Sequence, residues 1–164
     1  MSLALSMAKL AFEEGEVPVG AIVVHEGRVI GEGYNKVIAN NSVSSHAEIL
    51  AINNAGQAIQ NYRLKNCAIY VTLEPCHMCI KAIVDARLDC LYFGATEPKT
   101  GAVQSIDQFL DRDDLNHNVK FSGGHMVEES ADLLRNFFQL KRKSKKLFSD
   151  NALQSSASLK DLKF

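Results

Sequence analysis

Four residues in two short runs have the types and spacing that metal chemistry requires. His46 and Glu48 are separated by one residue, and Cys76 and Cys79 follow further along the chain in a Pro-Cys-x-x-Cys run. One imidazole and two thiolates suit zinc, with iron as the lesser alternative, and three protein ligands leave a fourth position open. The sequence therefore predicts one catalytic Zn²⁺ per subunit, held by His46, Cys76 and Cys79. Glu48 would move protons as the acid and base for a metal-activated water.

Other interpretations of the same residues predict a different kind of site. A fourth protein ligand would make the zinc structural, and His77, Cys67 and Cys90 are the candidates. We expect His77 to point away from the face that the paired cysteines share, and Cys67 and Cys90 to be buried in strands. A redox pair is the remaining interpretation of Cys-x-x-Cys, but it would not require the upstream His-x-Glu.

The metal ligands need helices and strands to bring them together. Apolar periodicity predicts a helix at 3–14, a hairpin of strands at 17–24 and 28–34, a helix at 46–55 capped by Ser44 or Ser45, a strand at 67–72, a helix at 75–86 and a strand at 90–93. A short helical segment at 103–109, weak strand candidates at 120–121 and 126–127, and a helix at 128–146 follow. This alternation predicts an α/β domain at 1–148, with helices on both faces of a sheet, and a mobile basic and polar tail at 149–164.

Composition and charge narrow the class of protein. The chain has 164 residues, 46% hydrophobic and 23% charged, which is typical of a globular domain. It has no apolar run long enough to span a membrane and no signal-like N-terminus, so we expect a cytoplasmic protein without a membrane partner. Residues 1–140 carry a net charge of −6 and residues 141–164 a net charge of +5. This asymmetry predicts contact with a polyanion, unless the basic segment is merely a solvated helix end.

Seven runs of sequence resemble bacterial tRNA-specific adenosine deaminases, which belong to the cytidine deaminase-like zinc deaminases. The runs are 16–21, 31–35, 46–49, 61–64, 70–76, 99–102 and 116–117. The resemblance implies a three-layer α/β/α cytidine deaminase-like fold with a five-stranded mixed sheet. It also implies a homodimer whose partner helps to bind RNA. The activity it implies is conversion of adenosine to inosine at the first anticodon position of an arginine tRNA, with the base flipped into the site.

The same resemblance assigns roles to individual residues. It implies that Asn35 contacts the flipped nucleoside, that the Ala47 backbone holds the base edge, and that Asn116 contacts the RNA. It also implies that Phe138 borders the anticodon. Asn35 as a simple turn residue and Phe138 as part of the core are the structural alternatives.

The loop after residue 94 departs from the family pattern. Glu97 stands where the family has a shorter Asp that contacts the RNA, and Thr96 is neutral where a basic residue is usual. Both changes would affect binding of the substrate rather than the chemistry at the metal. From charge alone, we expect Lys99, Lys141 and Arg142 to contact the RNA backbone.

Two other functions compete with deamination of transfer RNA. The first is a guanine, cytosine or nucleoside deaminase that acts on a free small molecule. The second is a non-catalytic RNA-binding module stabilised by zinc. The basic C-terminal segment and the 99–102 and 116–117 runs argue against the first, and the combination of Glu48 with an open metal position argues against the second.

Overall fold

The computed structural model describes residues 1–158, with side chains described through residue 146. The elements are α1 (Ser2–Glu13), β1 (Gly20–His25), β2 (Arg28–Tyr34), α2 (Ala47–Ile59), β3 (Cys67–Leu73), α3 (His77–Asp85), β4 (Cys90–Ala95), the 3₁₀ helix η1 (Phe109–Asp111), β5 (Lys120–Ser122) and α4 (Val127–Ser158). The strands form one sheet in the order β2-β1-β3-β4-β5. β1 runs antiparallel to β2 and β3, whereas β3, β4 and β5 are parallel. The predicted five-stranded mixed sheet is therefore confirmed.

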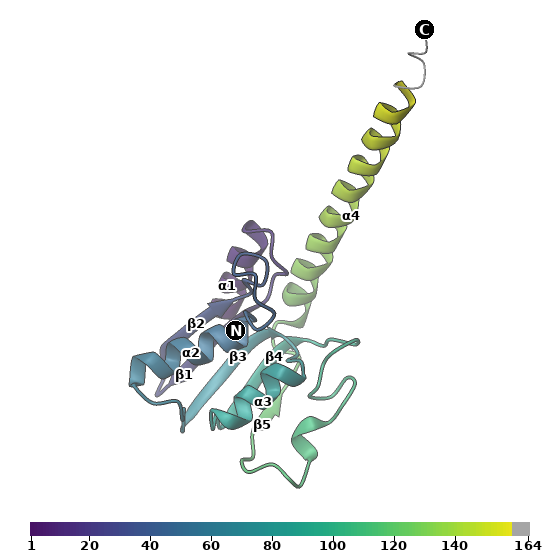
Figure 1. Cartoon of the computed structure of the whole chain (residues 1–164). Helices are drawn as coiled ribbons and strands as arrows, with labels where there is room; N and C mark the ends of the chain where they lie inside the picture. The colour runs from purple at the N-terminus through teal and green to yellow at the C-terminus, as the bar shows by residue number, and fades with distance from the viewer. Residues whose placement is uncertain (159–164) are drawn as a thin grey trace.

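Helices cover both faces of this sheet, as the α/β/α prediction requires. Side chains alternate between the two faces of the sheet along β3, so Cys67, Ile69 and Val71 point to the same face. There they pack in one buried cluster with the apolar residues of α2 and α3. The opposite face receives α1 and α4, where the backbones of Gly20 and Gly94 lie directly against these helices. In Figure 1, α2 and α3 cover the same side of the sheet, and α4 runs outward beyond its edge.

Close packing of α2 on the hairpin fixes the start of that helix. A Cβ atom at Gly33 would clash with the Ala47 carbonyl and the Ala51 N–H group, and one at Gly31 would clash with the next turn. The small residues on both surfaces let the two backbones touch. Because His46 and Glu48 lie at the start of α2, this contact positions them relative to the sheet.

Three local predictions are wrong, each for a visible reason. Neither predicted serine caps α2: His46 is its N-cap residue, and the Asn35 side chain supplies the acceptor instead. The segment 103–109 is not a helix: residues 103–105 form turns whose N–H groups donate to the buried Glu74 carboxylate, 106–108 are irregular, and Phe109 only begins the 3₁₀ helix η1. Residues 126–127 form no strand, since Met126 has a positive φ of 54° and Val127 opens α4.

The end of α4 also differs from the prediction. The sequence predicts a last helix that ends near residue 146, whereas α4 continues to Ser158. The predicted mobile tail at 149–164 lies partly outside the described residues, and its mobility stays a prediction. Among residues 1–158, no helix is both long and apolar enough to cross a membrane.

Candidate active site

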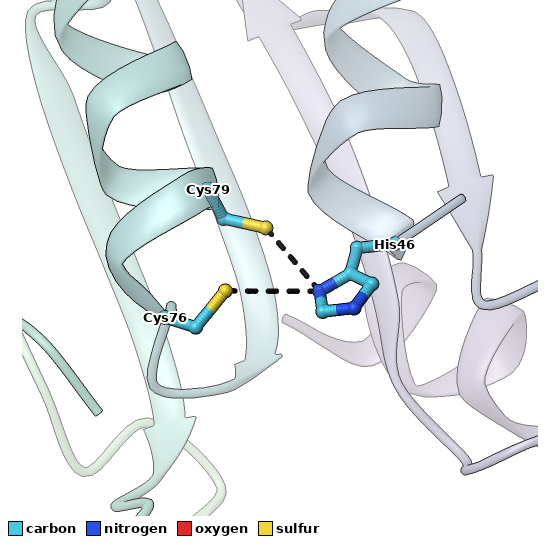
Figure 2. A group of neighbouring side chains, drawn as sticks. All are labelled: His46, Cys76 and Cys79. Atoms are coloured by element: carbon cyan, nitrogen blue, oxygen red, sulfur yellow. Dashed lines mark hydrogen bonds between the residues drawn. The ribbon is translucent and has the colours of Figure 1, made fainter. Parts of the chain in front are cut away.

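The three predicted metal ligands meet where two helices begin. His46 is the N-cap residue of α2, Cys76 is the N-cap residue of α3, and Cys79 lies in the first turn of α3. The Nδ1 atom of His46 lies 3.8 Å from the Sγ of Cys76 and 3.5 Å from the Sγ of Cys79. Figure 2 shows the imidazole facing both sulfurs across the gap between the helices. Both helix N-termini therefore direct their partial positive charge toward the thiolates.

The donor set fits a zinc ion. Tetrahedral zinc with Zn–S of about 2.3 Å and Zn–N of about 2.05 Å separates a nitrogen and a sulfur ligand by about 3.6 Å. The two observed N···S separations, 3.8 and 3.5 Å, bracket that value. A hydrogen bond from the Cys79 thiol, helped by one from His46, lowers the pKa of Cys76 to about 3. The same sulfur–sulfur hydrogen bond, followed by burial, raises the pKa of Cys79, so its proton would leave on metal binding.

The competing ligands do not join this group. Cys67 begins β3 and Cys90 begins β4, whereas the metal ligands lie beyond the opposite ends of these strands. His77 has its Nε2 atom 3.0 Å from the Oδ2 of Asp107, on the exposed side of α3. Within the described part of the chain, the metal-binding group consists of three residues, as predicted for a catalytic site.

Glu48 lies beside the metal ligands, in the first turn of α2. Its side chain is 4% exposed. Burial, the largest influence, raises the pKa of Glu48 from 4.5 to about 7. A carboxyl group with a pKa near neutrality can both accept and donate a proton at physiological pH. The geometry therefore suits the acid and base role predicted for it.

Two of the metal ligands, His46 and Cys76, line a cleft of about 340 Å³ together with Glu48, and the buried Cys79 lies behind them. This volume lies near the lower end of the range for small-ligand sites, which suits one nucleobase with its sugar. The apolar part of its wall consists of Val17, Val19, Val37, Ile38 and Leu73. Asn35, Glu97 and Thr100 supply polar groups.

Asn35 connects this cleft with the start of α2. It is buried, and its Oδ1 accepts a hydrogen bond of 2.9 Å from the Ala47 N–H group. The side chain thus satisfies one of the free N–H groups at the start of α2, so Asn35 is more than a turn residue. Ala47 is fully buried. The predicted contacts of Asn35 and the Ala47 backbone with a nucleoside stay predictions.

The remaining predicted substrate residues divide into two groups. Glu97 lines the cleft, and its Oε1 accepts a hydrogen bond of 2.9 Å from the Lys99 N–H group. Asn116 lies outside the cleft, where its side chain and carbonyl accept hydrogen bonds from Arg87. Lys141 and Arg142 are exposed on α4.

Phe138 is exposed, so its interpretation as a core residue is wrong. Its side chain is 45% exposed. The neighbouring Phe137 is buried instead, and its ring meets the Phe12 ring edge-on at 5.7 Å. Phe138 remains available for contact with a partner, and its predicted place beside the anticodon stays a prediction.

Two buried carboxylates at the cleft were missing from the sequence prediction. Glu16 accepts hydrogen bonds of 2.8 Å from the N–H groups of Ile38 and Ala39. Glu74 accepts hydrogen bonds from four backbone N–H groups and one hydroxyl. An acidic residue next to a Pro-containing apolar run was the one signal available in each case, and it does not reveal partners so distant in sequence.

Comparison with known proteins identifies the family. The MafB19-like deaminase family profile matches residues 1–142. The tRNA-specific adenosine deaminase of Haemophilus influenzae is 45% identical over 159 residues, covering 96% of this chain and 91% of that protein.

Solved structures agree with this assignment. A structure from work on A-to-I editing by tRNA:A34 deaminases has a TM-score of 0.80 and 44% identity, covering 82% of this chain and 97% of the other. Guanine deaminase from Nitrosomonas europaea has a TM-score of 0.69, covering 83% of this chain and 81% of the other, but at 21% identity it shares the fold alone. The resemblance noted in the sequence is thus confirmed, and the chain belongs to the family of tRNA-specific adenosine deaminases.

Proposed function

We propose that this chain is a zinc-dependent deaminase that converts adenosine to inosine at the wobble position of a transfer RNA, with an arginine tRNA as substrate. The observation that carries the proposal is the grouping of His46, Cys76 and Cys79 at a cleft that the buried Glu48 also lines. Membership of the tRNA-specific adenosine deaminases supports adenosine in RNA as the target. We further propose that the enzyme works in the cytoplasm as a homodimer with one Zn²⁺ per subunit.

His46, Cys76 and Cys79 would hold the metal. Zinc bound there would supply Lewis-acid activation of a water molecule. The overall reaction adds one water, breaks the bond between C6 and the exocyclic amine, and releases ammonia. Glu48 accepts a proton from the attacking water and donates it to the ring nitrogen; it then accepts the second proton of that water from the new C6 hydroxyl and donates it to the leaving amine. One carboxyl group suffices because each pair of accepting and donating steps returns it to the carboxylate.

The environment of Glu48 suits its proposed role in proton transfer. In the metal-free protein, burial raises the pKa of Glu48 to about 7, so both protonation states are accessible near neutral pH. The apolar wall around it would exclude bulk water and give the flipped base a surface to contact. Asn35 keeps the start of α2, and therefore Glu48, in place from within the same cleft.

Contact with the rest of the RNA needs positive charge outside the cleft. The body of the protein is acidic, and α4 carries Lys141, Arg142 and Lys143 on an exposed stretch. Salt-dependent contacts between these side chains and phosphates would hold the anticodon stem-loop. Lys99 beside the cleft would contribute another such contact, and the exposed ring of Phe138 would border the anticodon.

A competition assay tests this function against a deaminase of free bases. Purified protein with a measured zinc content is incubated with an anticodon stem-loop that carries adenosine at the first anticodon position. Guanine, cytosine and free nucleosides are offered in parallel. We expect inosine in the stem-loop, dependent on zinc, and no conversion of the free compounds. Conversion of a free base in preference to the stem-loop would contradict the proposal, and binding of RNA without ammonia release would indicate a non-catalytic module.

A further inference from the structure

Glu74 lies between a strand of the sheet and a metal ligand. It directly follows the end of β3, and Pro75 and Cys76 come next. The side chain is 2% exposed although it carries a carboxylate. A buried charge of this kind requires partners, because desolvation is costly. Its partners all belong to a single loop further along the chain, residues 97–105.

This 97–105 loop is wrapped around the Glu74 carboxylate. Oε1 accepts hydrogen bonds from the N–H groups of Val103, Gln104 and Ser105, at 3.1, 2.8 and 3.0 Å. Oε2 accepts one of 3.0 Å from the Glu97 N–H group and another from the Ser105 hydroxyl. Both ends of the loop are therefore bound to one side chain.

The charge of Glu74 is part of this arrangement. Four backbone N–H groups and one hydroxyl donate hydrogen bonds to its two oxygens, so the carboxylate form is the one that the loop stabilises. A neutral amide of the same shape would present N–H donors to a group of donors.

The backbone of the 97–105 loop also packs closely against Glu74 and the two residues that follow it. A Cβ atom at Gly101 would lie 2.5 Å from the Glu74 Oε2, so only glycine lets the loop approach this closely. The Ala102 N–H group donates a hydrogen bond of 2.9 Å to the Pro75 carbonyl, and Gly101 forms a bridge with Cys76. The loop is joined to the segment that carries a metal ligand.

The 97–105 loop forms one wall of the cleft. Glu97 and Thr100 belong to this wall. Ile38 also lines the cleft, and its N–H group donates a hydrogen bond to Glu16. Two segments that line the cleft therefore each have a buried carboxylate as an anchor.

We propose that Glu74 is a positioning residue that fixes the 97–105 loop as a rigid wall of the substrate cleft and so determines how tightly the nucleoside is held. The inference rests on the proposed deaminase function for its kinetic consequence. Glu74 acts through the N–H groups and the Ser105 hydroxyl of the loop that places Glu97 and Thr100 in the cleft wall. A loose wall weakens binding of substrate and transition state alike, which raises KM and leaves kcat nearly unchanged.

The test compares Glu74→Gln and Ser105→Ala with the wild type and with Glu13→Gln, an exposed substitution on α1 that serves as the control. Ser105→Ala removes only one of the five hydrogen bonds and keeps the buried charge, so it remains informative if Glu74→Gln folds poorly. Amide hydrogen exchange is followed across the whole chain. Zinc content is measured, and KM and kcat are determined on the anticodon stem-loop. Glu16→Gln provides a comparison at the other buried carboxylate, which binds the N–H groups of Ile38 and Ala39.

In Glu74→Gln we expect amides of the 97–105 loop to exchange about tenfold faster, since a charge-assisted hydrogen bond is worth about that factor or more. KM should rise by about tenfold, with kcat within a factor of about three and zinc content unchanged. Ser105→Ala should raise the exchange rate of the 97–105 loop and KM by smaller factors than Glu74→Gln. Glu16→Gln should speed exchange near residues 38–39 and not in the 97–105 loop.

Two results would overturn the inference. One is unchanged exchange of the 97–105 loop in both variants. The other is loss of zinc and of kcat at constant KM, which would mean that Glu74 serves Cys76 instead. Hydrogen exchange does not depend on activity. A wild-type protein that forms no inosine would therefore contradict the proposed function, and the exchange result would still decide the role of Glu74.

Discussion

Replacing Glu48 by Gln should abolish activity and stabilise the metal-free protein at alkaline pH. The folded protein holds this carboxyl group in a buried position and raises its pKa from 4.5 to about 7. The folded state therefore keeps its proton over a pH range in which the unfolded chain has lost it. Stability from this group falls as pH rises from about 4.5 to about 7, because the folded state binds more protons than the unfolded state there.

The size of the effect follows from the shift. Each pKa unit corresponds to about 1.4 kcal/mol, so a shift from 4.5 to about 7 corresponds to about 3 kcal/mol at a pH above both values. Glu48→Gln removes this term because the amide has no charge to bury. The variant should therefore be more stable than the wild type by up to about 3 kcal/mol at about pH 8, and by much less at about pH 5.

Urea unfolding of chelator-treated protein at these two pH values measures the difference, with Glu13→Gln as an exposed control. Inosine formation by the zinc-loaded variant should fall by about 100-fold or more, since the proposed mechanism gives Glu48 every proton transfer of the reaction. A stability difference that is the same at both pH values would refute the explanation of the raised pKa. Full activity of the variant would refute the proton-transfer role.

Three further substitutions test other parts of the structure. Gly33→Ala should destabilise the protein by about 1–3 kcal/mol in urea unfolding and lower activity, because the new methyl group would push the start of α2 off the sheet; unchanged stability would contradict the close contact. Ser130→Ala should keep or raise the melting temperature with activity unchanged, since this buried hydroxyl has no hydrogen-bond partner within the described residues; a drop would reveal a hidden partner. Glutamine at Lys141, Arg142 and Lys143 should weaken binding of the stem-loop and reduce its salt dependence by about one unit of slope per lost phosphate contact; an unchanged slope would exclude α4 from the RNA contact.

The grouping of the three candidate metal ligands could be predicted from sequence because their spacing encodes it, and the binding of zinc there stays a prediction. Cys76 and Cys79 lie within one turn of helix, and Glu48 lies two residues from His46, so local structure alone groups them into two pairs. Joining the two pairs required the sheet, and the alternating helices and strands predicted it correctly. The prediction succeeded where residue type and short-range periodicity were sufficient.

The anchors of the cleft could not be predicted in the same way. Glu74 binds N–H groups 23 to 31 residues further along the chain. A backbone N–H group has no residue type, so no sequence pattern marks it as a partner. Asn35 raises the same difficulty, because its hydrogen bond to Ala47 spans 12 residues and replaces the local serine cap that was expected. Single buried polar contacts over such distances depend on the finished fold.

The central claim is that the centre formed by His46, Cys76, Cys79 and Glu48 deaminates an adenosine in transfer RNA. The most direct measurement is inosine at the first anticodon position of an arginine tRNA, quantified together with released ammonia, for the zinc-loaded wild type and for Glu48→Gln. The account predicts equal amounts of inosine and ammonia from the wild type, and at least about 100-fold slower formation by the variant. No inosine from zinc-loaded wild-type protein, or equal rates for the two proteins, would contradict it.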